Sequence, residues 1–391
     1  MACPKHFIGD GSVEYGTGED DMLIDRGDAT LTDEELDELL EPYRAAIAAG
    51  AKTVMISHSS VNGVKAHAST DLITGVLKGE LGFDGFVISD WESIEHIPAE
   101  NLKEQVGIAI NAGIDMLMQP SNYIDCYKCI VSLVNGGVIP MERIDDAVTR
   151  ILTVKRDMGL FDDPMQENIT TIYPAARGEE TLAVAEELVE KSQVLLKNEN
   201  ELLPIAAGTK VYVMGPAADD IGAQCGGWTL TWQGQTDDEY GRLLEGTSII
   251  EALEASSGSH GYTVVSDPAD ADLVLLCVGE KPYAEWEGDT EDMSLTGAMS
   301  LYGTAKAIDE AKKLGLPTVT LIVAGRNVLI SDWLDDWDAV VMCYLPGTEG
   351  QGIVNVLTGD APFTGRLPMP WYENVSQIGT DSCLFPLGYG L

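Results

Sequence analysis

Two groups of acidic residues follow short apolar runs and could perform nucleophilic or acid–base chemistry. Asp90 and Trp91 end the run GFVISDW, and barrel enzymes place catalytic groups at the carboxyl ends of parallel strands. Glu285 lies among several carboxylates and two aromatic residues in VGEKPYAEWEGD, a setting that could house a general acid of raised pKa. Both groups have simpler explanations, because Asp90 could cap the following helix and the second group could be solvated surface charge.

Two other segments carry side chains that could hold a sugar. Lys5 and His6 are neighbours in KHFIGDG, and both could donate hydrogen bonds to hydroxyl groups. Trp228 and Trp232 lie four residues apart in the glycine-rich segment CGGWTLTWQG, where indole rings could act as flat platforms. The alternatives are a structural Lys–His pair and a buried aromatic pair.

The charge balance excludes several classes of function. The chain has 391 residues, with 23 Lys and Arg against 64 Asp and Glu, and a formal net charge of −41. A nucleic-acid-binding protein needs a basic face, and anionic membranes repel an acidic protein. No stretch approaches the ~20 apolar residues of a membrane span. Because high salt would screen the self-repulsion of this surface, we expect a salt-adapted protein, with an ordinary acidic protein as the alternative.

The cysteines and histidines indicate neither a disulfide framework nor a metal site. The seven cysteines are odd in number, and the close pair Cys126-x-x-Cys129 has no second pair to complete a zinc site, so we expect two ordinary helix residues. The five histidines form no H-E-x-x-H motif. GTEGQG follows a late strand and lacks the acidic partner of a dinucleotide site. We therefore expect no cofactor and disfavour a nucleotide-binding protein.

The elements that must position these residues form two α/β regions. In residues 1–160 we expect helices over about 32–49 and 141–158, the first with a capping box from Thr32 and Glu35. They alternate with four expected strands, at His6–Gly9, Thr53–Ser57, Phe86–Asp90 and Asp115–Gln119. Four βα units in succession favour a parallel α/β architecture.

A polar linker is expected over residues 161–178, and a second α/β region over 179–391. Helices are expected near 246–256 and 298–314. The expected strands are continuous apolar runs, at Lys210–Gly215, Leu273–Val278, Thr318–Ala324 and Ala339–Leu345. Such runs are typical of parallel strands buried on both faces, so this region is predicted to be a doubly wound open sheet.

The first region is too short for a complete barrel. An eight-unit barrel takes about 250 residues, whereas only residues 1–160 precede the expected linker. The region is therefore either a smaller α/β domain or half of a barrel whose front half is missing or lies on another polypeptide.

The order of motifs along the chain resembles glycoside hydrolase family 3, in its β-glucosidase and β-glucan exohydrolase branch. The segments that carry the resemblance are KHFIGDG, TVMISHSSVNGVKAH, LGFDGFVISDW, NAGIDMLMQP, QCGGWTLTWQG, VGEKPYAEWEGD, LPGTEGQG and PLGYGL. The resemblance implies that residues 1–160 are the C-terminal half of a (β/α)8-type barrel and lack its N-terminal part. It implies that residues 179–391 are a doubly wound α/β sandwich domain.

The resemblance also implies roles for individual residues. Asp90, in the barrel region, would be the catalytic nucleophile, and Glu285, in the sandwich region, the general acid/base. The other implied positions would bind the substrate, and they are Lys5, His6, Glu19, His58, Trp91, Met118, Trp228 and Trp232. His58 stands where glucan exohydrolases usually have an aromatic residue, which predicts a different pocket floor.

The resemblance implies a retaining, exo-acting hydrolase that removes glucose from the non-reducing ends of β-glucosides and β-glucans. Retention requires two carboxyl groups ~5–5.5 Å apart. Two alternatives stay open. One is a fragment that is inactive or needs the missing half barrel, supplied by an N-terminal half or by a homodimer partner. The other is a related β-xylosidase. The expected partner is a β-glucoside or oligosaccharide, not nucleic acid or membrane, and the protein would be secreted or periplasmic if its true start lies upstream.

Overall fold

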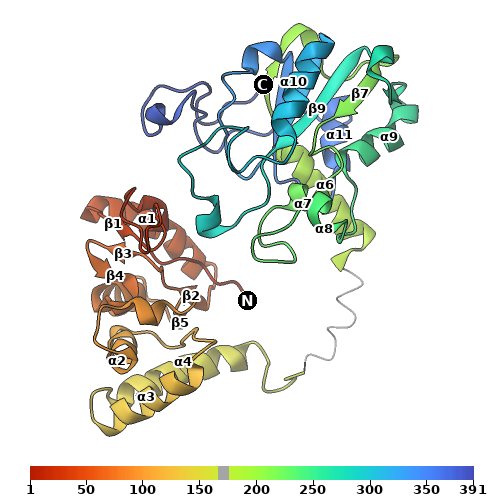
Figure 1. Ribbon diagram of the computed structural model, residues 1–391. Coiled ribbons are helices and arrows are strands. Elements are labelled where there is room, and N and C mark those ends of the chain that lie inside the picture. Colours follow the sequence, from red (N-terminus) through yellow and green to blue (C-terminus); the bar gives the residue numbers. More distant parts are fainter. Residues whose placement is uncertain (166–175) are drawn as a thin grey trace. The chain divides into compact units, whose positions relative to one another are not determined.

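The computed structural model describes residues 1–165 and 176–391, and contacts within the chain divide it into two compact units, Met1–Ile169 and Thr170–Leu391 (Figure 1). Of the linker expected over 161–178, residues 166–175 lie outside the described part of the chain. Among the described residues, no helix combines the length and the apolar composition needed to cross a membrane. Both units contain helices and strands, as predicted for an α/β protein.

A row of four parallel segments forms the centre of the first unit. β2 (Thr53–Met55) pairs in parallel with β5 (Phe86–Ile88). Isolated parallel bridges add the segment of Phe7 beside β2 and the segment of Met116 beside β5. The four segments therefore lie side by side in chain order, each parallel to the next.

Each of the two outer segments pairs through a single bridge, so both are much shorter than the strands predicted there. The strand expected at His6–Gly9 ends where Gly9 takes a φ of 103° and turns the chain into a 3-10 turn. In the segment expected at Asp115–Gln119, the Asp115 carboxylate accepts the Val87 N–H at 2.8 Å. A carbonyl of a neighbouring strand would otherwise accept that N–H.

The first unit also contains a small three-stranded sheet. β1 (Asp28–Ala29), β3 (Ser60–Val61) and β4 (Val64–Lys65) form it in the order β1–β3–β4. β3 and β4 are an antiparallel hairpin closed by Asn62 and Gly63, whose φ angles are 51° and 79°. An Asn-Gly pair favours such a turn because both central residues need positive φ.

Helices surround the row of parallel segments in the first unit. α1 (Asp33–Ala48) confirms the first predicted helix, with Thr32 and Glu35 in the predicted capping box. α4 (Met141–Asp157) confirms the second. The remaining helical elements are α2 (Leu102–Ala112), α3 (Tyr123–Asn135), the π-helix η3 (Asp71–Glu80) and the 3-10 turns η1 (Asp10–Ser12), η2 (Ala66–Ala68) and η4 (Ser93–His96).

A six-stranded sheet in the order β6–β11–β10–β9–β7–β8 forms the centre of the second unit. Its strands are β6 (Val194–Asn198), β7 (Lys210–Met214), β8 (Thr263–Val265), β9 (Leu273–Gly279), β10 (Thr318–Val323) and β11 (Ala339–Tyr344). The four predicted strands are confirmed with small changes at their ends, and they run parallel. The sheet is nevertheless mixed, because β6 runs antiparallel to β11.

Two strands of this sheet were missed by the sequence analysis, and both lie at its edges. β8 is short and only half buried, so it lacks the continuous apolar run that marks the inner strands. β6 begins directly after α6 (Glu179–Ser192), with only Gln193 between them. No turn residue separates the two elements, and turn residues are the usual boundary signal.

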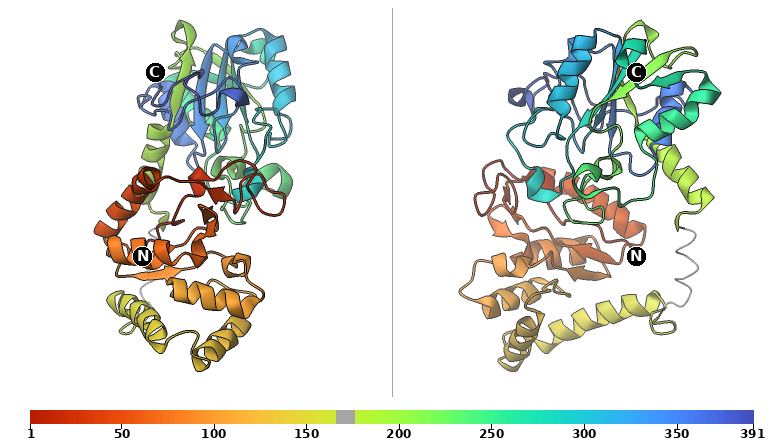
Figure 2. Two further views of the ribbon diagram at one scale, coloured as in Figure 1. Left: turned by 90° about the vertical axis from the view of Figure 1, so that its left-hand side faces the viewer. Right: turned by 45° about the vertical axis from the view of Figure 1, so that its right-hand side comes forward.

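Helices cover both faces of the sheet (Figure 1, and turned by 45° in Figure 2). Besides α6 they are α7 (Ile221–Cys225), α8 (Asp237–Tyr240), α9 (Ile249–His260), α10 (Thr304–Leu314) and α11 (Gln351–Thr358). α9 and α10 confirm the helices predicted near 246–256 and 298–314. Alternate side chains of β9 enter two buried clusters, in which Leu275 packs with α9 and α11, and Leu276 packs with α10. The 3-10 turns are η5 (Glu199–Glu201), η6 (Pro268–Asp270), η7 (Glu285–Gly288), η8 (Leu334–Asp336) and η9 (Val375–Gln377).

Candidate active site

Asp90 follows β5 at the carboxyl end of the parallel row, as the sequence predicted. Its Oδ1 accepts the Trp91 N–H at 2.6 Å, and its Oδ2 lies 3.6 Å from Nε2 of His6. The Asp90 side chain is only 18% exposed. Asp90 is therefore a largely buried carboxylate with a donor on one oxygen and an imidazole near the other.

His6 lies between two carboxylates. Its Nδ1 is 2.6 Å from Oδ2 of Asp10, and Ser57 Oγ donates to the other Asp10 oxygen. The hydrogen bond to Asp10 raises the pKa of His6, although burial opposes the shift. The negative charge of Asp90 adds to the rise in the pKa of His6. Lys5 precedes His6 with an exposed side chain.

His67, which the sequence analysis did not select, supports the backbone of Asp90. The ring is fully buried in the turn after the β3–β4 hairpin, and its Nε2 accepts the Asp90 N–H at 3.0 Å. The same side chain is hydrogen-bonded to the backbone of Ser57. Burial lowers the pKa of His67 to about 3, so the ring is neutral and Nε2 is free of a proton. His67 thus joins the carboxyl ends of β2 and β5.

His58 and Glu19 lie in a second group near η4. The His58 Nδ1 is hydrogen-bonded to Ser93 Oγ, and its ring centroid is 5.3 Å from that of His96. Burial lowers the pKa of His58 to about 3. Glu19 has Oε1 2.6 Å from Lys65 Nζ and Oε2 2.9 Å from His96 Nδ1. Burial raises the pKa of Glu19, but these two partners outweigh it and hold the pKa below its usual range.

Met118 and Trp91 complete the surroundings of Asp90. The Met118 N–H donates to Ser89 Oγ at 2.8 Å, and the Met118 carbonyl accepts the Glu92 N–H at 2.9 Å. These bonds fix the fourth parallel segment to the end of β5. The Trp91 side chain is 58% exposed, so its ring is available for an apolar ligand face.

Glu285 opens the 3-10 turn η7 in the second unit, on the loop that follows β9. Its φ is 52°, in the left-handed region that non-glycine residues rarely adopt. The preceding Ala284 N–H donates to Gln233 Oε1 at 2.7 Å. At the far end of the turn, the Gly288 carbonyl accepts from Arg326 Nη1 at 2.6 Å. The backbone on both sides of Glu285 is thus held by side chains from other segments.

Three tryptophans gather beside this turn. The ring centroids of Trp228 and Trp232 are 6.4 Å apart, and those of Trp232 and Trp286 are 4.8 Å apart in an edge-on arrangement. Trp228 is 66% exposed and Trp232 40% exposed, which contradicts a buried aromatic pair. Gly227 lets the segment approach closely, since a Cβ there would lie 2.1 Å from the Tyr283 carbonyl oxygen.

Glu280 differs from the other carboxylates of its motif in its burial and its partners. Its side chain is almost completely buried, and Arg326 Nη2 lies 2.8 Å from Oε1. Tyr283 donates its hydroxyl to Oε2 at 3.0 Å. Glu280 is therefore the buried anion of a structural ion pair, whereas Glu285 and Glu287 both lie on the turn beside the tryptophans.

Models of glycoside hydrolase family 3 match both units, the N-terminal domain over residues 1–154 and the C-terminal domain over residues 193–391. The chain belongs to glycoside hydrolase family 3. It is 32% identical to a lysosomal beta glucosidase of Dictyostelium discoideum and 28% identical to a beta-xylosidase of Formosa agariphila. Both alignments cover the whole chain, but 51% and 59% of those relatives.

The solved structure of an exo-1,3/1,4-beta-glucanase from a Pseudoalteromonas species is also similar to this family 3 chain. It superposes with a TM-score of 0.88 at 34% identity, over the whole of this chain and 50% of that one. The chain thus spans about half the length of the curated relatives it matches.

In this family 3 chain, the predicted site residues form two groups in the first unit and one group in the second. In the first unit His6, Trp91 and Met118 surround Asp90, whereas Glu19 and His58 lie in the group near η4. In the second unit the Ala284–Gln233 hydrogen bond and the Trp232–Trp286 contact tie the Glu285 turn to the tryptophan segment. The group around Asp90 can supply a nucleophilic carboxylate. The group around Glu285 can supply an acid beside aromatic platforms.

Five residues of these groups were not predicted as site residues: Lys65, His67, His96, Trp286 and Arg326. Trp286 was noted only as one of the two aromatic residues in the motif around Glu285. The others are distant in sequence from their partners, and His67 and Arg326 act partly on backbone atoms, which leave no trace in a sequence.

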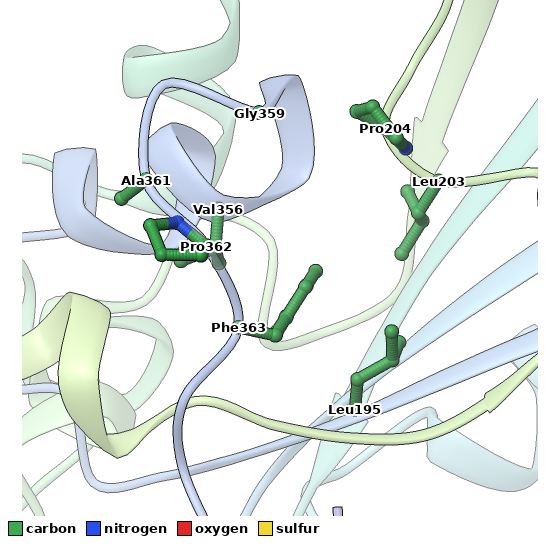
Figure 3. Close-up of a pocket in the computed structure, with 8 residues that line it drawn as sticks. All are labelled: Leu195, Leu203, Pro204, Val356, Gly359, Ala361, Pro362 and Phe363. Atoms are coloured by element: carbon green, nitrogen blue, oxygen red, sulfur yellow. The ribbon is translucent and has the colours of Figure 1, made fainter. Parts of the chain in front are cut away.

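The cysteines and a cavity in the second unit add no second chemical centre. All seven cysteines are free, with Cys126 and Cys129 on α3 as expected. Among the described residues, no group of three His, Cys, Asp or Glu could hold a metal ion. A cavity of about 240 Å³ in the second unit is lined by Leu195, Leu203, Pro204, Val356, Gly359, Ala361, Pro362 and Phe363 (Figure 3). This lining offers no acid or base.

Proposed function

We propose that the chain supplies both catalytic carboxylates of a retaining, exo-acting β-glucosidase that releases glucose from the non-reducing ends of β-glucosides and β-glucans. Asp90 is the nucleophile and Glu285 the general acid/base. The observation that carries the proposal is the setting of Asp90, a mostly buried carboxylate after β5 with the Trp91 N–H at 2.6 Å and His6 nearby. The names of the family relatives, a beta glucosidase and an exo-beta-glucanase, support the substrate class.

The local contacts suit the two carboxylates to different tasks. Asp90 accepts the Trp91 N–H on one oxygen and faces His6 with the other, so its carboxylate is held in place for nucleophilic attack. Asp90 attacks the anomeric carbon while Glu285 protonates the leaving oxygen, and Glu285 then activates the water that releases the sugar. Lys5 and His6 donate hydrogen bonds to sugar hydroxyls, Trp91 stacks on the ring, and Met118, Glu19 and His58 line the innermost subsite. Trp228 and Trp232 flank the next sugar.

We further propose that residues 1–160 form the C-terminal half of a (β/α)8-type barrel, linked through 161–178 to a doubly wound α/β sandwich over 179–391. Four parallel segments in chain order support the half barrel, as does the share of the relatives that the chain covers. Unpaired edges of parallel segments favour association with another chain. The complement is the N-terminal half of the barrel or, failing that, a second copy of this chain.

Release of nitrophenol from an aryl β-glucoside tests the proposal. The chain is assayed alone and with the N-terminal half of a family 3 barrel, and its oligomeric state is measured by light scattering. Activity that disappears in Asp90→Ala while the variant stays folded supports the assignment. Wild-type turnover by Asp90→Ala would defeat it. Activity of the chain alone only as a dimer would identify the second copy as the complement.

A β-xylosidase is the second candidate, because a beta-xylosidase of Formosa agariphila is 28% identical over the whole chain. Xylose lacks the hydroxymethyl group of glucose, so the two sugars differ only at C5 of the ring. The ratio of kcat/KM for aryl β-glucoside and aryl β-xyloside decides between them, and a ratio below one would replace glucose by xylose as the substrate.

A further inference from the structure

One guanidinium group contacts both ends of the loop that carries Glu285. Arg326 follows β10, and its Nε and Nη2 donate to the carboxylate of Glu280 at the start of the loop, with distances of 3.1 Å to Oε2 and 2.8 Å to Oε1. Its Nη1 donates to the carbonyl of Gly288 at the end of the loop, at 2.6 Å. Arg326 therefore fixes the separation of residues 280 and 288.

The interior of the loop packs against the same group. The Tyr283 ring lies 4.9 Å from the Arg326 guanidinium carbon, and its hydroxyl donates to Glu280 at 3.0 Å. Gly288 sits directly on this ring, since a Cβ there would lie 2.5 Å from Tyr283 Cδ2. The buried Glu280 and the half-buried Arg326 and Tyr283 thus form a support under the turn.

The turn above this support is strained. Glu285 has a φ of 52°, and a non-glycine residue keeps such a conformation only where its surroundings impose it. Upstream, the Ala284 N–H is held by Gln233. Downstream, Arg326 holds the Gly288 carbonyl. Loss of the downstream anchor would let the turn relax and move the Glu285 carboxyl.

We propose that Arg326 is a positioning residue that holds Glu285 where it can exchange a proton with the glycosidic oxygen. The inference rests on the proposed role of Glu285. Lysine cannot replace arginine here, because a single ammonium group cannot make both the forked contact with Glu280 and the bond to Gly288. A displacement of about 1 Å can lower the rate about 100-fold, so the effect is measurable.

Dependence on the leaving group tests this role, because a good leaving group departs without protonation. In the active enzyme, with its barrel complement where activity needs one, Arg326→Lys should lower kcat/KM for an alkyl β-glucoside by about 10- to 100-fold. For a dinitrophenyl β-glucoside kcat/KM should fall less than about threefold. Hydrogen exchange of the peptide over 280–289 should accelerate in the same variant, a readout that needs no activity.

Two further variants keep the test decisive. The double variant Arg326→Met with Glu280→Gln removes both charges of the ion pair, so that no carboxylate is buried without a partner. It should give the same leaving-group dependence. Tyr262→Phe is the matched control, because it removes a buried hydrogen bond to Leu253 O in the same unit without touching the loop. It should lower stability and leave the ratio of the two substrates unchanged.

The outcomes separate this inference from the proposed function. Glu285→Ala is measured beside the other variants, and an equal loss on both substrates would overturn the role of Glu285. If Glu285→Ala shows the selective loss but the folded Arg326 variants lose activity equally on both substrates, or lose none, the positioning role is overturned and the function stands. Unchanged exchange of the 280–289 peptide would also overturn it.

Discussion

The histidines around the end of β5 differ in the charge that they can carry. His6 is paired with Asp10, and its pKa is raised, whereas burial lowers the pKa of His58 and of His67 to about 3. One imidazole can therefore bring a positive charge near Asp90 while two neighbours stay neutral. The division suits the site, because Asp90 must be ionised and the Nε2 of His67 must stay bare to accept a hydrogen bond.

The charge on His6 should depend on Asp10. Asp10→Asn removes the carboxylate that stabilises the imidazolium, so the pKa of His6 should fall. NMR titration of the five histidines measures it. His260, whose raised pKa comes from Ser256 and Asp360, should titrate unchanged and is the internal control. An unchanged His6 pKa in Asp10→Asn would show that Asp10 does not stabilise the charged form of His6.

Acidification should unfold the protein through His58 and His67. Both have folded pKa values of about 3 against about 6.5 in an unfolded chain, so the unfolded state binds protons first. Their contribution is complete above pH 6.5 and is lost as the pH falls toward 3. As the pH falls from 6.5 to 5, the free energy of unfolding should fall with a slope that grows from about 0.7 to about 1.4 kcal/mol per pH unit for each histidine.

Urea unfolding at several pH values measures this slope. His6 does not interfere, because its raised pKa affects stability only as the pH rises above 6.5. His67→Gln should flatten the slope, whereas His260→Gln, at a half-buried site of the second unit where the histidine pKa is raised, should not. Stability that stays constant between pH 6.5 and 5 would contradict the neutral, buried state of the two rings.

The tryptophan segment and the Glu285 loop pack closely through their backbones at Gly227 and Tyr283. Gly227→Ala would place a Cβ 2.1 Å from the Tyr283 carbonyl oxygen, so the tryptophan segment should separate from the Glu285 turn. We expect a changed tryptophan emission spectrum and a loss of activity of at least about tenfold. Gly258→Ala is the control, since that α9 glycine has no neighbour within 4 Å and alanine should stabilise the helix by about 0.5–1 kcal/mol. A normal spectrum and full activity in Gly227→Ala would show that the segment tolerates separation.

The predictability of an element depended on where it lies in the fold. β9, β10 and β11 are buried on both faces, so their apolar runs identified them. The capping box at Thr32 fixed the start of α1 because it is a local interaction. β8 and the segment of His6–Gly9 depend on neighbours and on a single glycine φ, which the sequence does not encode as a pattern. Asp90 and Glu285 were predicted from motifs, whereas the side chains that hold the backbone around them were recognised only in the structure.

The net charge of −41 acts on the molecule as a whole. Self-repulsion opposes the compact state, and dissolved salt screens it, with a Debye length of about 10 Å at 0.1 M and about 3 Å at 1 M. We propose that the protein is salt-adapted, so its Tm should rise between 0.1 M and molar KCl. A Tm that stays flat or falls would contradict this adaptation. Sorbitol at matched osmolality is the control for effects other than screening.

The hairpin of Asn62 and Gly63 bears on how the protein ages. An asparagine before glycine loses ammonia when the glycine nitrogen attacks the side-chain amide. Here the Asn62 amide is held at both ends by Leu31, at 2.8 and 3.0 Å, and the Gly63 N–H donates to Asp28 at 2.8 Å. Formation of the cyclic imide would have to break these hydrogen bonds. The fold therefore protects the Asn62 side-chain amide from the deamidation that a free peptide would undergo. Storage under conditions that partly unfold the first unit would therefore convert Asn62 irreversibly to isoaspartate. The isoaspartate content at this position would then measure the total time that the first unit had been unfolded.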